Sequence, residues 1–155
     1  MTAVLAIDPG TTESAWVILK DGIPKAFGKE SNDDVLAMLV DSRDPGLSVV
    51  IEKIACYGMA VGEEVFETVF WTGRFAQSWE GAVDRITRKE VALHICNSPR
   101  ASDANVRCAL IDRFGGKEAA VGRKNNPGPL YGISGDCWAA LAVGITWIEK
   151  QVTPT

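Results

Sequence analysis

Three acidic residues stand at the ends of apolar segments: Asp8 follows VLAI, Glu52 follows LSVVI, and Asp136 precedes CWAALAVGI. Each alone could equally cap a helix or lie solvated at the end of a strand. Carboxylates brought together repel one another and raise their pKa values, and a divalent cation relieves that repulsion. Oxygen ligands select Mg²⁺ or Mn²⁺ over zinc. Two such ions, about 3.5–4 Å apart, can activate a water and stabilise the leaving oxygen of a phosphodiester. The three acids together therefore indicate phosphodiester hydrolysis.

The turn behind Asp8 is compatible with a second kind of site. Pro9 and Gly10 make a tight turn, and Thr11 and Thr12 follow it. In such an Asp-x-Gly-Thr-Thr turn, backbone amides can hold the phosphates of a nucleotide. The turn by itself does not decide between a metal site and a phosphate cradle.

The elements that must position the acids are mostly strands in the first half of the chain and mostly helices in the second. The pattern predicts strands at 3–8, 14–20 and 23–28, a helix at 33–41, a strand at 47–54, a helix at 62–79, a strand at 91–99, a helix from Ser102 or Asp103 to Phe114, a loop at 115–132 and a last helix opened by Asp136. This order is typical of an α/β domain with a mixed sheet. If the first and fourth strands are neighbours, Asp8 and Glu52 lie side by side, and the last helix can bring Asp136 to them.

Composition predicts an ordinary globular protein of the cytoplasm. Its 155 residues fit a single domain over 1–150 with a short tail at 151–155. No apolar run approaches the ~18–20 residues of a membrane span, and MTAVLAIDPG lacks the basic start of a signal peptide. The four cysteines are widely spaced without a CxxC pair, as expected of reduced thiols rather than of a zinc site.

Charge is unevenly distributed along the chain. The net charge is −4, yet the window 85–124 holds nine Lys or Arg against four Asp or Glu. A basic sector on an acidic chain is compatible with binding a phosphate backbone. On charge alone, a solvated surface explains it equally well.

Four segments together resemble the RuvC-like Holliday-junction resolvases, in the order and spacing of that family. IDPGTTESAWVI is similar to the first motif, VVIEKI to the second, ASDANVRCALIDRF to the start of the next helix, and SGDCWAALAVGI to the closing helix. The short length and the contexts Tyr57-Gly58-Met59 and Gly73-Arg74-Phe75 are more similar to a phage-encoded branch, which would place the protein in a host cytoplasm.

The resemblance implies an RNase H-like α/β fold with a mixed five-stranded sheet flanked by helices. It also implies a homodimer that cuts branched DNA with two Mg²⁺ (or Mn²⁺) ions per site and leaves 5′-phosphate and 3′-hydroxyl ends. Asp8, Glu52 and Asp136 match metal ligands of the family. A second acid usually follows three residues after the last one, but here that position is Ala139. Asp103 is the candidate substitute, with an ordinary helix N-cap as the alternative.

The resemblance leaves the DNA contacts less determined than the acids. The family's frequent lysine after the Asp103 position is Ala104 here. Phosphate contacts are therefore assigned to basic residues around the basic sector: Arg74, Arg100, Arg107, Lys117, Arg123 and Lys124. His94 and Trp16 are predicted to be core residues, and the aromatic side chains of the 62–79 helix belong either to the core or to a dimer interface.

Two other functions stay open at this point. IDPGTTES also resembles the first phosphate loop of the actin, Hsp70 and sugar-kinase group, but those ATPases need two lobes and 155 residues supply one. The chain also contains no second Asp-x-Gly-Thr-Thr phosphate loop and no Gly-Gly stretch before a helix for adenosine, so no nucleotide cofactor is expected. A DNA-binding relative without catalysis is the third possibility, and Ala139 is the feature that favours it.

Overall fold

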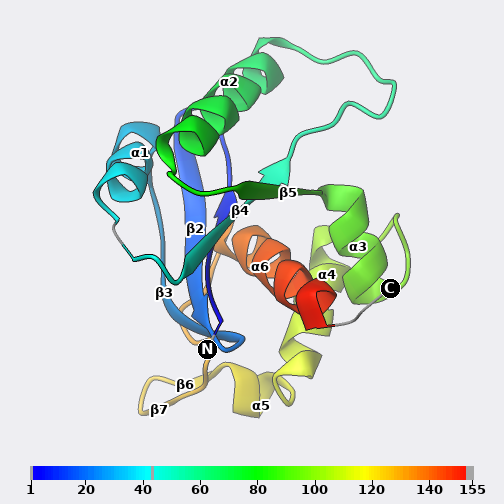
Figure 1. Ribbon diagram of the computed structural model, residues 1–155. Helices are drawn as coiled ribbons and strands as arrows, with labels where there is room; N and C mark the ends of the chain where they lie inside the picture. Colours follow the sequence, from blue (N-terminus) through cyan, green and yellow to red (C-terminus); the bar gives the residue numbers. More distant parts are fainter. Residues whose placement is uncertain (1, 43, 153–155) are drawn as a thin grey trace.

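A computed structural model describes residues 2–42 and 44–152, and its centre is a mixed five-stranded sheet (Figure 1). The strands are β1 (Ala3–Asp8), β2 (Glu13–Lys20), β3 (Ile23–Ser31), β4 (Leu47–Lys53) and β5 (Val83–Thr87), in the spatial order β3-β2-β1-β4-β5. The first three strands form an antiparallel meander, and β4 and β5 run parallel to β1. The predicted fold class, with β1 and β4 as neighbours, is confirmed.

Helices cover both faces of this sheet. The helices are α1 (Asn32–Asp41), α2 (Glu63–Ser78), α3 (Arg88–Cys96), α4 (Asp103–Arg113), α5 (Lys117–Ala120) and α6 (Cys137–Val152). Figure 1 shows α1 and α2 together on one side and α6 with α3 and α4 on the other. Between residues 2 and 152, position 43 apart, no helix is long and apolar enough to cross a membrane.

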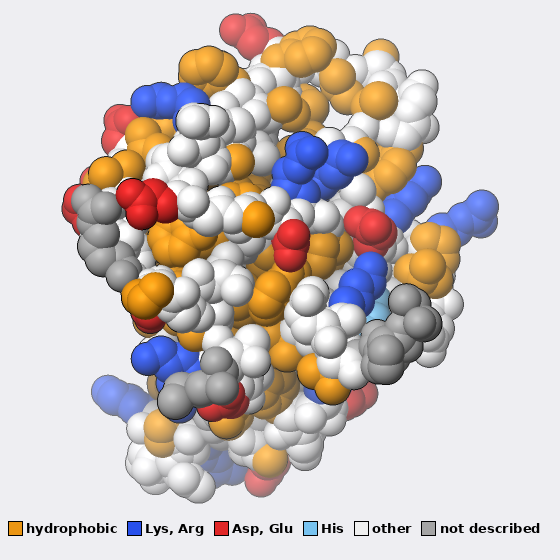
Figure 2. Space-filling view, viewed as in Figure 1, with side chains coloured by type: hydrophobic (Ala, Val, Ile, Leu, Met, Phe, Trp, Pro, Cys, Tyr) orange, Lys and Arg blue, Asp and Glu red, His pale blue; other side chains and the backbone are white. Residues whose placement is uncertain are grey.

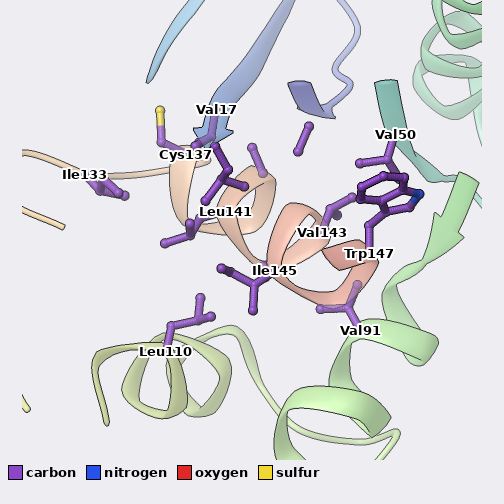
Figure 3. Close-up of a cluster of buried hydrophobic side chains, with 14 of the residues drawn as sticks. Val17, Val50, Val91, Leu110, Ile133, Cys137, Leu141, Val143, Ile145 and Trp147 are labelled. Carbon is purple, nitrogen blue, oxygen red and sulfur yellow. The ribbon is translucent and has the colours of Figure 1, made fainter. Parts of the chain in front are cut away.

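The central strands divide their side chains between two cores. Successive strand residues point to opposite faces of a sheet, so Val4 and Ala6 of β1 join the cluster around α6, while Leu5 and Ile7 join the cluster around α1 and α2. Figure 3 shows the larger cluster, in which Leu141 and Val143 of α6 lie against the sheet. Strands buried on both faces hold their backbone ends in fixed positions, and Asp8 and Glu52 stand at those ends.

The last helix packs unusually close to the sheet because of Gly144. A side-chain carbon at this position would collide with Leu19 and Ala6. Nine residues of α6 are buried, so the helix is apolar over most of its circumference and forms the middle of its layer. Of the predicted tail, Gln151 and Val152 still belong to α6, and residues 153–155 lie outside the described residues.

The predicted strand at 91–99 is wrong, because these residues belong mostly to α3. The fifth strand is the preceding segment β5, VDRIT, whose only fully buried residue is Ile86. Thr87 then starts the helix with a capping box: its hydroxyl accepts from the Glu90 amide, and the Glu90 carboxylate accepts from the Thr87 amide. Val91 and Ile95, four residues apart, share the buried face of a helix, although their β-branched side chains favour a strand locally.

Other details of the structure also bear on what the sequence pattern predicts. The predicted loop at 115–132 contains α5 and a small hairpin, β6 (Gly122–Arg123) with β7 (Asn126–Pro127). His94 lies on helix α3 rather than on a strand, and its Nε2 is 2.8 Å from Glu149 Oε1 of α6. The predicted strand for His94 is therefore wrong, and its side chain is partly exposed rather than in the core, although it has a polar partner in Glu149. Trp16 is partly buried beside the α1–α2 core, where its indole N–H donates to Glu30.

Candidate active site

The carboxyl ends of β1 and β4 bring Asp8 and Glu52 together. Their parallel pairing sets Ile7 opposite Ile51, so the next residue of each strand emerges at the same edge of the sheet. Asp136, immediately before α6, approaches this edge from the other layer. All three acids line one cavity of about 400 Å³, which also contacts the Pro9–Thr11 turn, Glu64 and Thr68 of α2, and Arg88 of α3. The predicted convergence of these three carboxylates is therefore what the fold produces.

Buried polar side chains fix the turn that follows Asp8. The Ser14 hydroxyl accepts from the Gly10 amide (3.1 Å) and donates to Asn32 Oδ1 (2.6 Å). The Asn32 side chain in turn donates to the Gly10 carbonyl (3.0 Å). A Cβ at Gly10 would collide with the Glu13 carbonyl, so glycine is required there. Because the Gly10 N–H is directed at Ser14, it is not available to a phosphate, which weighs against the phosphate-cradle alternative.

Burial and mutual repulsion raise the pKa values of the two acids at the strand ends. The pKa of Asp8 rises to about 7, first through burial and then through the negative charges of Glu52 and Asp136. Glu52 is only 7% exposed, and burial raises its pKa too, while Arg88 counteracts the rise. The ionised form of Asp8 is therefore destabilised in the free protein, and the group is only partly ionised near pH 7.

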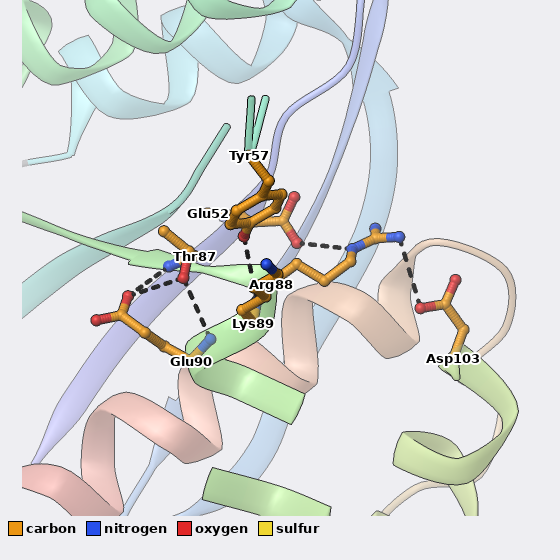
Figure 4. Close-up of polar contacts among 7 residues, drawn as sticks. All are labelled: Glu52, Tyr57, Thr87, Arg88, Lys89, Glu90 and Asp103. Carbon is orange, nitrogen blue, oxygen red and sulfur yellow. Dashed lines mark hydrogen bonds and ion pairs between the residues drawn. The ribbon is translucent and has the colours of Figure 1, made fainter. Parts of the chain in front are cut away.

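In the part of the chain that the structure describes, two basic residues contact the acids. Lys29 of β3 pairs with Asp136 at 2.8 Å. Arg88 lies between Glu52 and Asp103, with its Nε 3.6 Å from Glu52 Oε1 and its Nη1 3.6 Å from Asp103 Oδ1 (Figure 4). Among the described residues Asp8 has no basic group at ion-pair distance. Unlike Glu52 and Asp136, Asp8 therefore has no ion-pair partner that compensates its charge.

Asp103 lies outside the cavity lined by the other three acids, although its negative charge contributes to the raised pKa values of Asp8 and Glu52. Its side chain is 83% exposed and lies on the far side of Arg88. There it lines a second, smaller hollow of about 80 Å³ together with Arg107, Asp136 and Ala139. The alternative of an N-cap is wrong, because Ser102 caps α4 through a capping box with Asn105, and Asp103 is the first helical residue. The role of Asp103 as a substitute ligand stays a prediction.

The donor set fits a divalent cation by its chemistry. All three groups are carboxylates, which are hard oxygen donors suited to Mg²⁺ or Mn²⁺. The pKa of Asp8 is raised by burial and by the negative charges of Glu52 and Asp136, which a bound cation would offset. Among residues 2–42 and 44–152, however, no three Asp, Glu, His or Cys side chains already surround a common point. Glu52 and Asp136 are instead directed at Arg88 and Lys29.

The six basic residues predicted to contact DNA are scattered, and only Arg107 lines a hollow next to the acids. Arg74 covers the rings of Phe70 and Trp71 on α2. Lys117 and Arg123 share a separate hollow at α5 and the small hairpin, which Figure 1 shows beside the start of β1, at the opposite end of the sheet from Asp8. Arg100 lies between α3 and α4, and Lys124 is at the hairpin tip, where both are exposed.

Sequence reasoning missed Lys29 and Arg88. A usable signal existed for Arg88, because Thr87-Arg88-Lys89-Glu90 has the spacing of a capping box and marks a helix start after a strand. Placing a strand at 91–99 concealed that start. Nothing in the local sequence distinguishes Lys29, whose role follows only from the neighbouring position of β3 and the start of α6.

Solved structures supply the comparison that bears on the fold. RuvC of Thermus thermophilus superposes with a TM-score of 0.65 at 15% identity, covering 94% of this chain and 92% of that one. A structure of T. thermophilus RuvC in complex with Holliday junction substrate gives a TM-score of 0.67 at 16% identity, covering 98% and 97%. The chain has the RuvC fold. No protein-family model matches the sequence, and no curated protein does.

The RuvC fold explains why these three acids and not others come together. Its meander, its fourth strand and its last helix converge at a single edge, and Asp8, Glu52 and Asp136 each occupy one of those converging ends. The likeness at this level of identity concerns the architecture; the chemistry must be argued from the cavity.

Proposed function

We propose that this protein is a metal-dependent, structure-selective endonuclease that cuts branched DNA, with the four-way Holliday junction as its substrate. The observation that carries the proposal is the single cavity at the carboxyl ends of β1 and β4, lined by Asp8, Glu52 and Asp136 from three separate elements. A RuvC structure with Holliday junction substrate has the same fold. Membership of a phage-encoded branch and a location in the cytoplasm stay predictions from the sequence.

In this proposal the acids share the work of holding two Mg²⁺ ions, for which Mn²⁺ is an alternative. Asp8, Glu52 and Asp136 would hold the ions. When bound, the ions would supply an activated water and would offset negative charge on the phosphate. Hydrolysis then forms one bond between the water oxygen and phosphorus and breaks the bond from phosphorus to O3′. The leaving O3′ takes up a proton, so the products are a 3′-hydroxyl and a 5′-phosphate.

A homodimer through α2 supplies the second cutting site that a four-way junction needs. Phe66 and Phe70 are 64% and 59% exposed, and Figure 2 shows hydrophobic side chains gathered over α2 at the top of the molecule. The first half of α2 carries Glu63, Glu64 and Glu67, and the second half carries Arg74. Two copies packed antiparallel about Phe70 bring Glu67 of each near Arg74 of the other, as a two-fold interface requires.

Replacing Phe70 tests the dimer. A Phe70→Glu variant is expected to be a monomer by light scattering, because dimerisation would bury the new carboxylate against the apolar face of the second copy. Glu118→Gln, on the distant helix α5, is the control and should leave the mass unchanged. If Phe70→Glu still has twice the chain mass, α2 is not the interface.

A cleavage assay tests the activity. A labelled four-way junction and a linear duplex of the same sequence are incubated with wild type and with Asp8→Asn, in Mg²⁺ or in Ca²⁺, with Asp112→Asn on the exposed side of α4 as the control. Paired symmetrical nicks are expected on the junction only, with Mg²⁺, in wild type and in the control. Asp8→Asn should bind the junction at least as well, since a repulsive charge is gone, yet not cut it. Normal cutting by Asp8→Asn would refute the role of this acid.

The second candidate function is junction binding without cutting. Ala139 where a fourth acid is expected, and Asp103 held outside the acid cavity, favour it. Binding of the junction without nicks in either Mg²⁺ or Mn²⁺ would establish this function instead.

A further inference from the structure

Arg88 occupies a backbone position that is fixed on both sides. Before it, β5 pairs in parallel with β4, with Glu52 opposite Ile86 and Lys53 opposite Thr87. After it, the capping box of Thr87 and Glu90 holds the first turn of α3 (Figure 4). The Lys89 amide also donates to the Tyr57 hydroxyl at 3.3 Å, and the Lys89 ammonium lies 4.1 Å from the centre of the Tyr57 ring. The side chain of Arg88 therefore starts from a rigid point beside the acids.

The contacts of the Arg88 guanidinium are loose. Both of its ion pairs measure 3.6 Å, whereas charge-assisted N–H···O⁻ hydrogen bonds are about 2.7–2.9 Å long. Because 3.6 Å is the closest approach to each carboxylate, neither contact is as short as a charge-assisted hydrogen bond. A guanidinium held in this way keeps donors for another acceptor.

Arg88 also separates the two hollows of the site. It lines the cavity of the three acids and, on its other side, the smaller hollow that contains Ala139 and Arg107. At the position where a fourth carboxylate is expected, this chain has the methyl group of Ala139, and the guanidinium of Arg88 lines the same hollow. A planar fork of N–H donors at this place matches the non-bridging oxygens of a phosphate.

We propose that Arg88 is a catalytic residue whose guanidinium holds Glu52 in the free protein and binds the phosphate to be cut in the DNA complex, on the side of the site where the acid is replaced by Ala139. The inference rests on the proposed nuclease function. It assigns to Arg88 the stabilisation of the negative charge that grows on the phosphate in the transition state. It also makes Arg88 a competitor of a divalent cation for the Glu52 carboxylate.

Substitution of Arg88 is therefore expected to lower the rate of DNA cutting and to raise the affinity for Ca²⁺. Arg88→Gln should reduce the cutting rate at saturating Mg²⁺ and DNA by about 10²–10³-fold, the usual effect of removing one donor to a developing oxyanion. The same variant should bind Ca²⁺ at least about threefold more tightly in calorimetry without DNA, because a positive charge next to Glu52 is gone. Arg88→Lys keeps the charge but loses the planar arrangement of N–H donors, so its cutting rate should lie between those of the wild type and Arg88→Gln.

Arg85→Gln is the matched control. Arg85 is an exposed arginine on β5, three residues before Arg88, and its replacement by Gln removes the same charge. It should change neither the cutting rate nor Ca²⁺ affinity. A near-wild-type rate for Arg88→Gln, or weaker Ca²⁺ binding together with a lower Tm, would overturn the inference and leave Arg88 a structural residue. If the wild type itself does not cut the junction, the proposed function fails first, which is a distinct result.

Discussion

The two sides of the candidate site are built very differently. Asp8 and Glu52 stand at the ends of strands whose side chains fill both cores, so their backbone is enclosed by α1 and α2 on one face and by α6 on the other. Arg88, Asp103 and Arg107 come from the short helices α3 and α4, which follow the edge strand β5, and their side chains are largely exposed. The acidic side is therefore rigid, whereas the basic side combines a fixed backbone at Arg88 with exposed side chains that can adapt. In the proposed function the acidic side holds the metal ions and the basic side contacts the DNA.

The largest expected difference between the two sides is in catalysis. Glu52→Gln should reduce cutting of the junction at least about 10³-fold, because a buried ligand of the acid cavity loses its charge. Asp103→Asn should reduce it less than about tenfold, because this acid lies outside that cavity. Single-turnover rates of the two variants, measured side by side, test the contrast. Equal losses would show that Asp103 is a fourth ligand and that the site extends across Arg88.

A second contrast concerns stability. Ile51→Ala, next to Glu52 in a fully buried strand position, should lower the free energy of unfolding by about 2–5 kcal/mol, as core truncations of this size do. Thr87→Ala, which removes the cap beside Arg88, should cost only about 0.5–2 kcal/mol. Urea unfolding followed by circular dichroism measures both. A cost for Thr87→Ala as large as that for Ile51→Ala would contradict the view that the basic side is adaptable.

The acidic side should also make stability depend on pH. Burial and repulsion raise the pKa of Asp8 from 3.8 to about 7, so between these values the folded protein binds more protons than the unfolded chain. Stability must then fall as pH rises from about 4 to about 7 and level off above that range. In EDTA, Asp8→Asn should lack this part of the fall and be more stable than wild type above pH 7. Parallel pH profiles of the two proteins would contradict the raised pKa.

The same contrast explains what the sequence could predict. Asp8 and Glu52 follow uninterrupted apolar runs, and a strand buried on both faces leaves a pattern that is hard to mistake. The strand β5 has a single buried residue, and α3 begins with a local capping box followed by β-branched residues that resemble a strand. Edge and surface elements are specified by a few contacts with distant residues, such as Arg88 with Glu52 and Lys29 with Asp136, which no local pattern records. Asp136 was predictable as a helix start, but its lysine partner was not.

The smallest expected effect belongs to the basic residues far from the acids. Arg123 and Lys124 lie on the hairpin beside the start of β1, so they can contact only DNA that extends along the molecule. Replacing both with Gln should weaken junction binding severalfold and reduce the slope of log K against log salt by up to about 1.8, since each phosphate contact contributes about 0.9. The cutting rate at saturating DNA should not change, because neither residue lines the acid cavity.

Lys20→Gln with Lys25→Gln, an equal charge change on the acidic half of the chain, is the control for a general loss of charge. An unchanged salt slope in the hairpin variant would remove these two residues from the DNA surface and leave Arg88 and Arg107 as its basic side.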